Sequence, residues 1–193
     1  MKLMLNGAVT LGVEDGANIE IHEIQLELLE EIVRVNPNVA VVLFNGRPLD
    51  LRKVSRLAKA ILEVWLPGTE GGHAIIDVLT GKVNPSGKLP MSFPYCVGQV
   101  PVYYNAYSTG RGDFEGCKDH FRSRYLDIPN EPLYPFGYGL SYTEFEISAP
   151  ELNKDTLSAD GSLEASVTVT NKGTCQGTET LQLYIQDVFA SVV

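Results

Sequence analysis

The stretch that decides the fold is Ala60–Pro94, which reads AILEVWLPGTEGGHAIIDVLTGKVNPSGKLPMSFP. Its first six residues, Ala60–Trp65, predict a buried strand, because the run is apolar, bounded and too short to form a helix by itself. Apolar residues then recur at helical spacing after Thr69, and Gly81 is expected to end this helix as a C-cap. A strand, a tight turn, a helix and a second turn make up half of a doubly wound α/β unit.

The chain before this stretch continues the alternation of helices and strands. Glu23–Val35 predicts the strongest helix, and Val39–Phe44 is a valine-rich run typical of a strand buried on both faces. Ala8–Val13 is expected to form another strand, and Leu49–Lys59 another helix. This order predicts a mostly parallel, partial doubly wound sheet. The residues expected to form the buried stripe of the first helix are Ile24, Leu28, Ile32 and Val35, widened by Leu29.

Residues 95–135 lose this periodicity and are rich in tyrosine. A forty-residue irregular stretch inside a compact domain is uncommon and often functional. Two interpretations stay open at this point. In the first, the stretch is a long surface segment that links two domains. In the second, it forms the rim of a sugar site, where the faces of tyrosine rings can stack on carbohydrate rings.

From residue 143 onward the sequence predicts strands at Phe145–Ile147, Leu163–Thr170 and Thr180–Gln186. This pattern is typical of a β-sandwich, which needs about seven strands, so the sandwich is expected to be incomplete. The predicted domains are therefore residues 1–142, an α/β domain, and residues 143–193, a partial sandwich. Because an unfinished sandwich leaves an apolar face uncovered, we expect the isolated chain to self-associate.

Composition restricts the classes of partner. The 193 residues are 44% hydrophobic, with 15 basic and 24 acidic residues and a formal net charge of -9. That charge disfavours binding to nucleic acid and to anionic membrane surfaces. It neither supports nor opposes binding of an uncharged sugar. No apolar run is long enough to span a bilayer, and Met1–Leu11 lacks the features of a signal peptide.

The three cysteines, Cys96, Cys117 and Cys175, are widely spaced and show no metal-binding motif, and the histidines show no ligand spacing. No metal and no cofactor is therefore expected. Cys96 and Cys117 both lie in loop-like sequence, so a disulfide between them stays open.

Six short motifs occur in one consistent order and together resemble the C-terminal α/β domain of glycoside hydrolase family 3, the β-glucosidase family. Residues from Thr170 to Asp187 also resemble the fibronectin-type-III-like domain that follows it in many members. The resemblance covers Val39–Asp187 well and the first thirty-odd residues poorly. The six motifs are FNGRPL at 44–49, PGTEGG at 67–72, NPSGKLP at 84–90, SFP at 92–94, SRYLD at 123–127 and PLYPFGYGLSYT at 132–143.

The resemblance implies a retaining glycosidase, which uses a nucleophilic aspartate on an N-terminal barrel and an acid/base glutamate on a loop of the α/β domain. No barrel is encoded in these residues, so the isolated chain is expected to be inactive. The acid/base residue of relatives lies shortly before the segment matched by Ile19–Ile21. The nearest carboxylates here are Glu14 and Asp15, and Glu14 is the candidate.

The expected function is thus the C-terminal part of a retaining β-glucosidase-like hydrolase, which contributes the acid/base loop and the site rim. Its substrate would be a β-linked glucoside or a related glycoside or oligosaccharide. The alternative is a noncatalytic carbohydrate-binding or scaffold module. The resemblance is to the bacterial periplasmic or secreted branch of the family, so the parent protein is expected outside the cytoplasm.

Overall fold

The computed structural model describes residues 19–106, 110–112, 121–158, 160–185 and 187, and the backbone of residues 8–12. The chain divides into two compact units. We name them the sheet unit, made of residues 1–75, 88–138 and 182–193, and the hairpin unit, made of residues 76–87 and 139–181. Each is described by itself below. The domain boundary expected after residue 142 stays a prediction.

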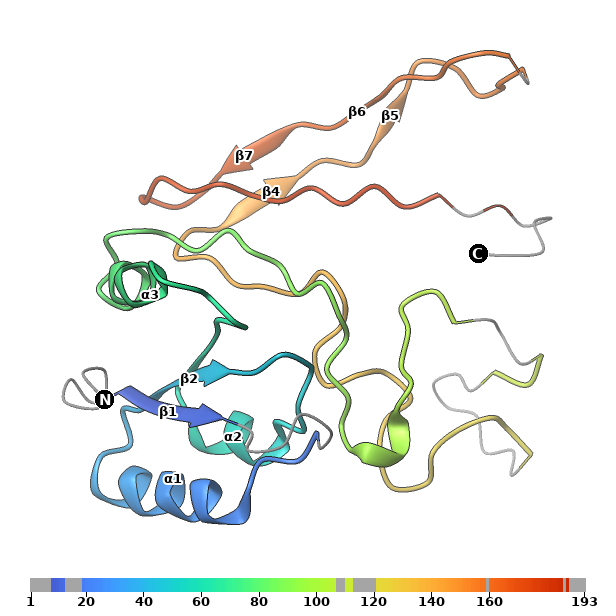
Figure 1. The fold of residues 1–193 in the computed structure, drawn as a ribbon. Coiled ribbons are helices and arrows are strands. Elements are labelled where there is room, and N and C mark those ends of the chain that lie inside the picture. Colours follow the sequence, from blue (N-terminus) through green and yellow to red (C-terminus); the bar gives the residue numbers. More distant parts are fainter. Residues whose placement is uncertain are drawn as a thin grey trace. The chain divides into compact units, whose positions relative to one another are not determined.

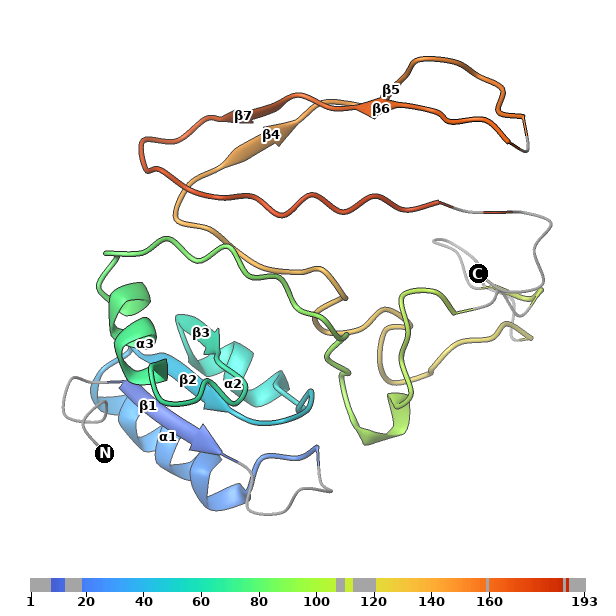
Figure 2. The same ribbon diagram turned by 45° about the horizontal axis from the view of Figure 1, so that its top comes forward.

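The sheet unit is built on three parallel strands in the order β1-β2-β3, of which Figure 1 labels the first two and Figure 2 labels all three. They are β1 (Ala8–Gly12), β2 (Ala40–Phe44) and β3 (Ala60–Glu63). All three lie within the ranges that the sequence predicts. In the centre of β2, Val41, Val42 and Leu43 are fully buried, as expected of a strand covered on both faces.

Strand β3 differs from its prediction in burial and in length. Its residues are at most half-buried, whereas the sequence predicts a buried strand that continues to Trp65. Among the described strands β3 pairs only with β2, so one of its edges has no strand beside it. An apolar run of this length does not distinguish an edge strand from a central one.

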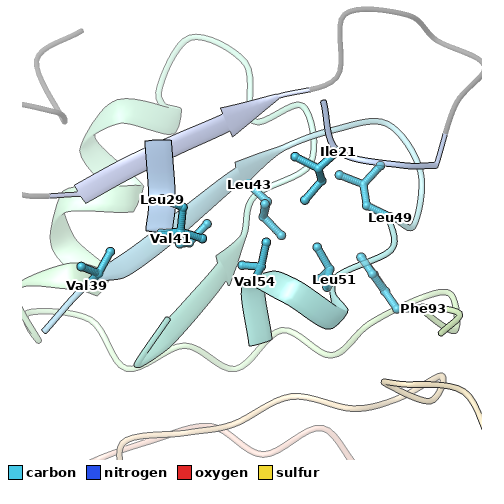
Figure 3. Packing of buried hydrophobic residues seen from close by; sticks show 9 residues of the cluster. All are labelled: Ile21, Leu29, Val39, Val41, Leu43, Leu49, Leu51, Val54 and Phe93. Carbon is cyan, nitrogen blue, oxygen red and sulfur yellow. The ribbon is translucent and has the colours of Figure 1, made fainter. Parts of the chain in front are cut away.

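The first helix, α1 (Glu23–Val35), has the bounds that the sequence predicts, but only Leu29 and Ile32 of the expected stripe pack in or against the core. Leu29 is fully buried, whereas Ile24 is 66%, Leu28 45% and Val35 83% exposed. Apolar residues cover more than half of the helix circumference, so periodicity alone does not choose which of them face the core. Figures 2 and 3 show α1 against the sheet, with Leu29 directed toward Val41.

Helix α2 (Arg52–Leu57) is shorter than the predicted Leu49–Lys59. At its start, the Asp50 carboxylate accepts the backbone N–H of Arg52 at 3.1 Å and pairs with the Arg52 guanidinium at 2.6 Å. At its end, Ala58 is extended and the backbone N–H of Lys59 donates to Val39 at 2.9 Å. A local side-chain contact therefore marks the start of the helix, and a tertiary hydrogen bond to Val39 takes the backbone out of the helix at its end.

Helix α3 (Gly71–Leu79) begins after Thr69 and ends before Gly81, as predicted. Gly81 has a φ of 74°, the left-handed conformation of a helix C-cap. At the other end, Gly71 lies so close to Pro67 that a Cβ on Gly71 would come within 2.6 Å of the proline ring. The close approach explains why a glycine stands at the first residue of the helix.

The core of the sheet unit joins the strands, α1, α2 and the segment that follows α3 (Figure 3). Phe93 is 1% exposed and exchanges two backbone hydrogen bonds with Tyr134, at 2.8 and 3.3 Å. Its ring lies 5.8 Å from that of Trp65 and 6.5 Å from that of Tyr134. The core residues are Ile21, Leu29, Val39, Val41, Leu43, Leu49, Leu51, Val54 and Phe93.

Residues 95–135 are irregular where the structure describes them, apart from the 3₁₀ turn Val97–Gln99. Gln99 organises this segment from inside, because its side chain is 2% exposed and hydrogen-bonds to both ends of the segment. Tyr134 is half-buried, whereas Tyr103 is 64% and Tyr104 61% exposed. The segment is therefore packed at its ends and presents tyrosines to solvent in between.

The hairpin unit contains two short antiparallel pairs (Figure 1). Strand β4 (Phe145–Ile147) pairs with β7 (Val169–Asn171), and β5 (Glu151–Leu152) pairs with β6 (Ala165–Ser166). The strand predicted over 163–170 is thus interrupted. At the interruption the Ser148 hydroxyl, rather than a backbone carbonyl, accepts the N–H of Thr168 at 2.9 Å.

The strand predicted at Thr180–Gln186 is wrong over the described residues, because residues 180–185 form no strand. Leu183 is 75% and Ile185 86% exposed. Alternation selects one face of a segment, but a strand also requires a partner for its backbone groups. Gln186 lies outside the described residues.

Candidate functional site at the carboxyl edge of the sheet

The three parallel strands all end at the same edge of the sheet. In register, Gly12 at the end of β1 pairs with Phe44, and Leu43 pairs with Glu63 at the end of β3. Asn45 follows β2 directly. Open α/β sheets bind their ligands beyond the carboxyl ends of the strands. We therefore expect functional side chains of the sheet unit to lie at this edge.

Asn45 is 4% exposed and is held by a short local hydrogen bond. Its side-chain nitrogen donates to the carbonyl oxygen of Arg47 at 2.7 Å. Its other polar atom, Oδ1, is buried and accepts no hydrogen bond. A buried acceptor without a donor is costly, so Asn45 carries an unused hydrogen-bonding capacity at this edge.

Glu63 carries a second unused oxygen. Its Oε1 accepts the backbone N–H of Trp65 at 2.8 Å, while its Oε2 is buried without a partner. Burial raises the pKa of Glu63 to about 7, although hydrogen bonds from the backbone of Trp65, the side chain of Asn45 and the backbone of Val64 lower it. Near neutral pH this carboxyl is therefore partly protonated, a condition that suits proton transfer as well as hydrogen-bond donation.

Trp65 follows Glu63 in an unusual backbone conformation. Its φ is 50°, which lies in the left-handed region that bulky residues rarely adopt. The indole is half-buried and packs against the core, in agreement with the core role that its position predicts. Such outliers persist where the surroundings hold them, and here the Glu63 carboxyl is one of the groups that do so.

Neither Asn45 nor Glu63 is predicted as a site residue from the sequence alone. An acid at position 63, inside a predicted buried strand, was the available signal. The predicted acid/base residue, Glu14, belongs to residues 13–18, which lie outside the described residues. In sequence it follows the last residue of β1 by two positions, and its role stays a prediction.

The two other acids of the Ala60–Pro94 stretch each contact a basic side chain on the surface. Glu70 pairs with His73 at 3.1 Å, and both side chains are more than 80% exposed. Asp77 pairs with the ammonium group of Lys82 at 3.0 Å. Solvent-exposed pairs of this kind contribute little to the stability of the fold, and they do not enclose a ligand site.

Cys96 and Cys175 are free, while Cys117 lies outside the described residues. In the described part of the chain, no group of three His, Cys, Asp or Glu side chains could hold a metal ion. No helix there is long and apolar enough to cross a membrane.

Comparison with known proteins identifies the family. Residues 6–142, more than half of the chain, match the model of the glycosyl hydrolase family 3 C-terminal domain. A periplasmic beta-glucosidase of Salmonella typhimurium is 51% identical over 175 residues, which are 91% of this chain and 23% of that protein. A beta-xylosidase of Formosa agariphila is 43% identical over 178 residues, 92% of this chain and 24% of that protein.

Solved structures agree with these relatives. The crystal structure of a beta-glucosidase from Listeria innocua matches with a TM-score of 0.88 and 43% identity, over 96% of this chain and 27% of that one. The chain thus spans about a quarter of the length of the relatives that it matches. On these grounds the chain belongs to glycoside hydrolase family 3 and matches the C-terminal domain of that family.

Proposed function

We propose that this chain forms the C-terminal part of a retaining β-glucosidase-like hydrolase and contributes the acid/base loop and the rim of the active site. The observation that carries the proposal is the family match over residues 6–142, with relatives named β-glucosidase and β-xylosidase. The predicted acid/base residue, Glu14, follows β1 in sequence, and parallel sheets bind ligands where strands end.

The mechanism requires two carboxyl groups about 5 Å apart, one a nucleophile and the other a proton donor to the leaving oxygen. Glu14 would supply the proton and then accept one from water. The nucleophile would come from a barrel domain outside these 193 residues. The partial doubly wound α/β domain and the partial β-sandwich belong to the same proposal, as the parts that support the loop.

Substrate and location follow from the relatives' names. The substrate would be a β-linked glucoside or a related glycoside, whose neutral hydroxyls are compatible with a net charge of -9. A periplasmic β-glucosidase at 51% identity supports a periplasmic or secreted parent protein.

A chimeric enzyme that carries this chain in place of the matching segment of a relative tests the proposal. The matching segment of the Salmonella typhimurium periplasmic β-glucosidase is replaced with this chain, and hydrolysis of an aryl β-glucoside and of a β-linked disaccharide is measured. Disaccharide turnover should be retained in the chimera and strongly reduced by Glu14→Gln. The neighbouring Asp15→Asn is the matched control and should leave turnover near that of the unmodified chimera. Equal effects of the two variants would reject Glu14 as the proton donor.

The alternative is a noncatalytic carbohydrate-binding or scaffold module, and the exposed Tyr103 and Tyr104 favour it over a purely structural role. Calorimetric titration of the 193-residue chain with glucose and cellobiose separates the two. Saturable binding by the chain alone, together with an inactive chimera, would favour the module.

A further inference from the structure

An aromatic cluster lies on the surface of the sheet unit, where two segments distant in sequence meet. Tyr104 of the irregular segment is 61% exposed, and its ring stacks on that of Phe136 with the centroids 4.6 Å apart and the planes inclined by 23°. The rings of Tyr104 and Tyr184 meet edge to face at 5.8 Å. Phe136 is half-buried and anchors the cluster to the unit. Tyr104 is therefore fixed in orientation while much of its ring stays open to solvent.

Gln182 holds the C-terminal side of this cluster in place. Its side-chain nitrogen donates to the carbonyl oxygen of Gly137 at 3.1 Å, and its Oε1 accepts the hydroxyl of Tyr184. Gly137 has a φ of 80°, and a Cβ at this position would overlap the Gln182 amide. A glycine at position 137 therefore allows both the left-handed backbone and the close approach of the amide.

The cluster offers the two kinds of contact that an uncharged sugar ring requires. The axial C–H bonds of a β-linked pyranose form flat apolar faces that can stack on an exposed ring such as that of Tyr104. The hydroxyls at the edge of the sugar need hydrogen-bond partners. A side-chain amide has two N–H donors and two acceptor lone pairs. The bonds among the described residues use one of each on Gln182, which is exposed, so one donor and one lone pair can bind a sugar.

We propose that Tyr104, Tyr184 and Gln182 form a binding platform for one pyranose ring of a β-linked oligosaccharide, with Tyr104 as its stacking surface. The choice of a glycoside as the ligand rests on the proposed function, whereas the position of the platform rests on the contacts of these residues. A sugar fits the cluster better than an apolar peptide does, because both exposed rings carry a hydroxyl and an amide borders them.

The neighbouring Tyr103 provides an internal comparison. It is 64% exposed, much as Tyr104 is, but no other ring among the described residues stacks on it. A side chain that becomes ordered on binding loses conformational freedom, whereas the contacts of Tyr104 have ordered its ring already. Tyr104 should therefore contribute more to sugar binding than Tyr103.

Saturation-transfer NMR of the 193-residue chain with cellobiose tests the platform, because irradiated tyrosine protons pass magnetisation to bound sugar. We expect transfer to the ring protons of cellobiose, and its concentration dependence gives the Kd. Tyr104→Ala should raise the Kd roughly three- to tenfold, as expected for the loss of one aromatic contact, and Tyr103→Ala by less than about twofold. No transfer in the wild-type chain, or equal effects of the two variants, would overturn the platform.

A pair of glycine variants tests the role of Gln182 and decides the matter if circular dichroism shows that Tyr104→Ala is unfolded. Gly137→Ala should displace the Gln182 amide and raise the Kd. Gly81→Ala is the matched control, because Gly81 has a similar φ of 74° but a Cβ there would meet no other described atom within 4 Å. Its Kd should equal that of the wild-type chain. An unchanged Kd in Gly137→Ala would overturn the platform as built on Gln182.

Turnover by the chimeric enzyme separates this proposal from the function on which its ligand rests. An active chimera, together with no transfer to cellobiose in the chain, would overturn the platform alone. An inactive chimera, together with transfer that depends on Tyr104, would support the platform and count against the proposed hydrolase. No transfer, together with a lower melting temperature of the Tyr104→Ala chimera, would assign the cluster to packing against the rest of the enzyme and overturn its role in sugar binding.

Discussion

The side-chain nitrogen of Gln99 lies 3.0 Å from the carbonyl oxygen of Glu131, 32 residues further along the chain. The same nitrogen also lies within hydrogen-bonding distance of the carbonyl oxygens of Pro129 and Asn130, at 3.1 and 3.2 Å. Its Oε1 accepts the N–H of Tyr95 at 2.7 Å. One buried amide therefore connects the beginning of the irregular segment to its end.

Replacement of this amide should destabilise the sheet unit. Gln99→Leu removes the buried amide that these backbone carbonyls and the N–H of Tyr95 bond to, and we expect a loss of about 1–3 kcal/mol in the free energy of unfolding. Urea denaturation followed by Trp65 fluorescence measures the loss. The exposed Gln176→Leu is the matched control and should change stability by less than about 0.5 kcal/mol. Equal stability of both variants would contradict this role of Gln99.

Two adjacent leucines of α1 test which face of that helix is buried. Leu29 is fully buried and Leu28 is 45% exposed. Leu29→Ala should therefore cost about 2–5 kcal/mol, because it leaves a cavity, and Leu28→Ala should cost about 1 kcal/mol or less. Denaturant titration of both variants gives the comparison. A larger loss for Leu28→Ala would contradict the burial of the Leu29 face.

The pH dependence of stability follows from Glu63. Burial raises the pKa of Glu63 to about 7 from its ordinary value of 4.5, so the folded state retains this proton more strongly than the unfolded state. The contribution to stability is complete below about pH 4.5 and is lost as the pH rises through 7. Allowing for partial contact with solvent, we expect a loss of about 2 kcal/mol by pH 8.

Thermal melts of the wild-type chain and of Glu63→Gln at pH 5.5 and pH 8 check this sign. The wild-type melting temperature should fall on going to pH 8 by more than that of the variant, since the neutral amide has no proton to lose. A wild-type melting temperature that rises toward pH 8, while that of the variant does not, would show that Glu63 is stabilised as an anion.

The exposed apolar residues near the C-terminal end of the described chain predict association. Leu183 is 75% and Ile185 86% exposed. The double change Leu183→Ser with Ile185→Ser should reduce the apparent mass measured by light scattering. Leu126→Ser, at a 93% exposed leucine elsewhere in the sheet unit, is the control and should leave that mass unchanged. A monodisperse wild-type monomer with a cooperative melt would contradict the prediction.

Leaving-group dependence tests Glu14 within the chimeric hydrolase. If Glu14 donates the proton, Glu14→Gln should reduce turnover of alkyl glucosides and disaccharides far more than that of nitrophenyl glucosides. A good leaving group departs with little help from an acid, so its reaction depends less on the donor. Rates for both substrate classes under saturating conditions give the ratio. Equal losses would assign Glu14 a positioning role.

Local sequence was sufficient where local rules decide the outcome. The bounds of α1 follow from its periodicity and from the Asn36-Pro37-Asn38 break, and Gly81 ends α3 because it can adopt a positive φ. Strand β2 was identifiable because a valine-rich run is buried on both faces wherever parallel strands flank it. The family followed from short motifs in a fixed order, which are a property of the sequence alone.

Features that depend on contacts between residues distant in sequence were decided only by the tertiary structure. Periodicity offered both Leu28 and Leu29 to the core, and only packing against β2 selected Leu29. The alternation at residues 180–185 indicated a strand, but these residues pair with none of the described strands. Glu63 and Asn45 are 18 positions apart in sequence, and parallel pairing places them at adjacent strand ends. Their unpaired oxygens and the raised pKa of Glu63 arise from burial, which a sequence specifies only after the whole chain has folded.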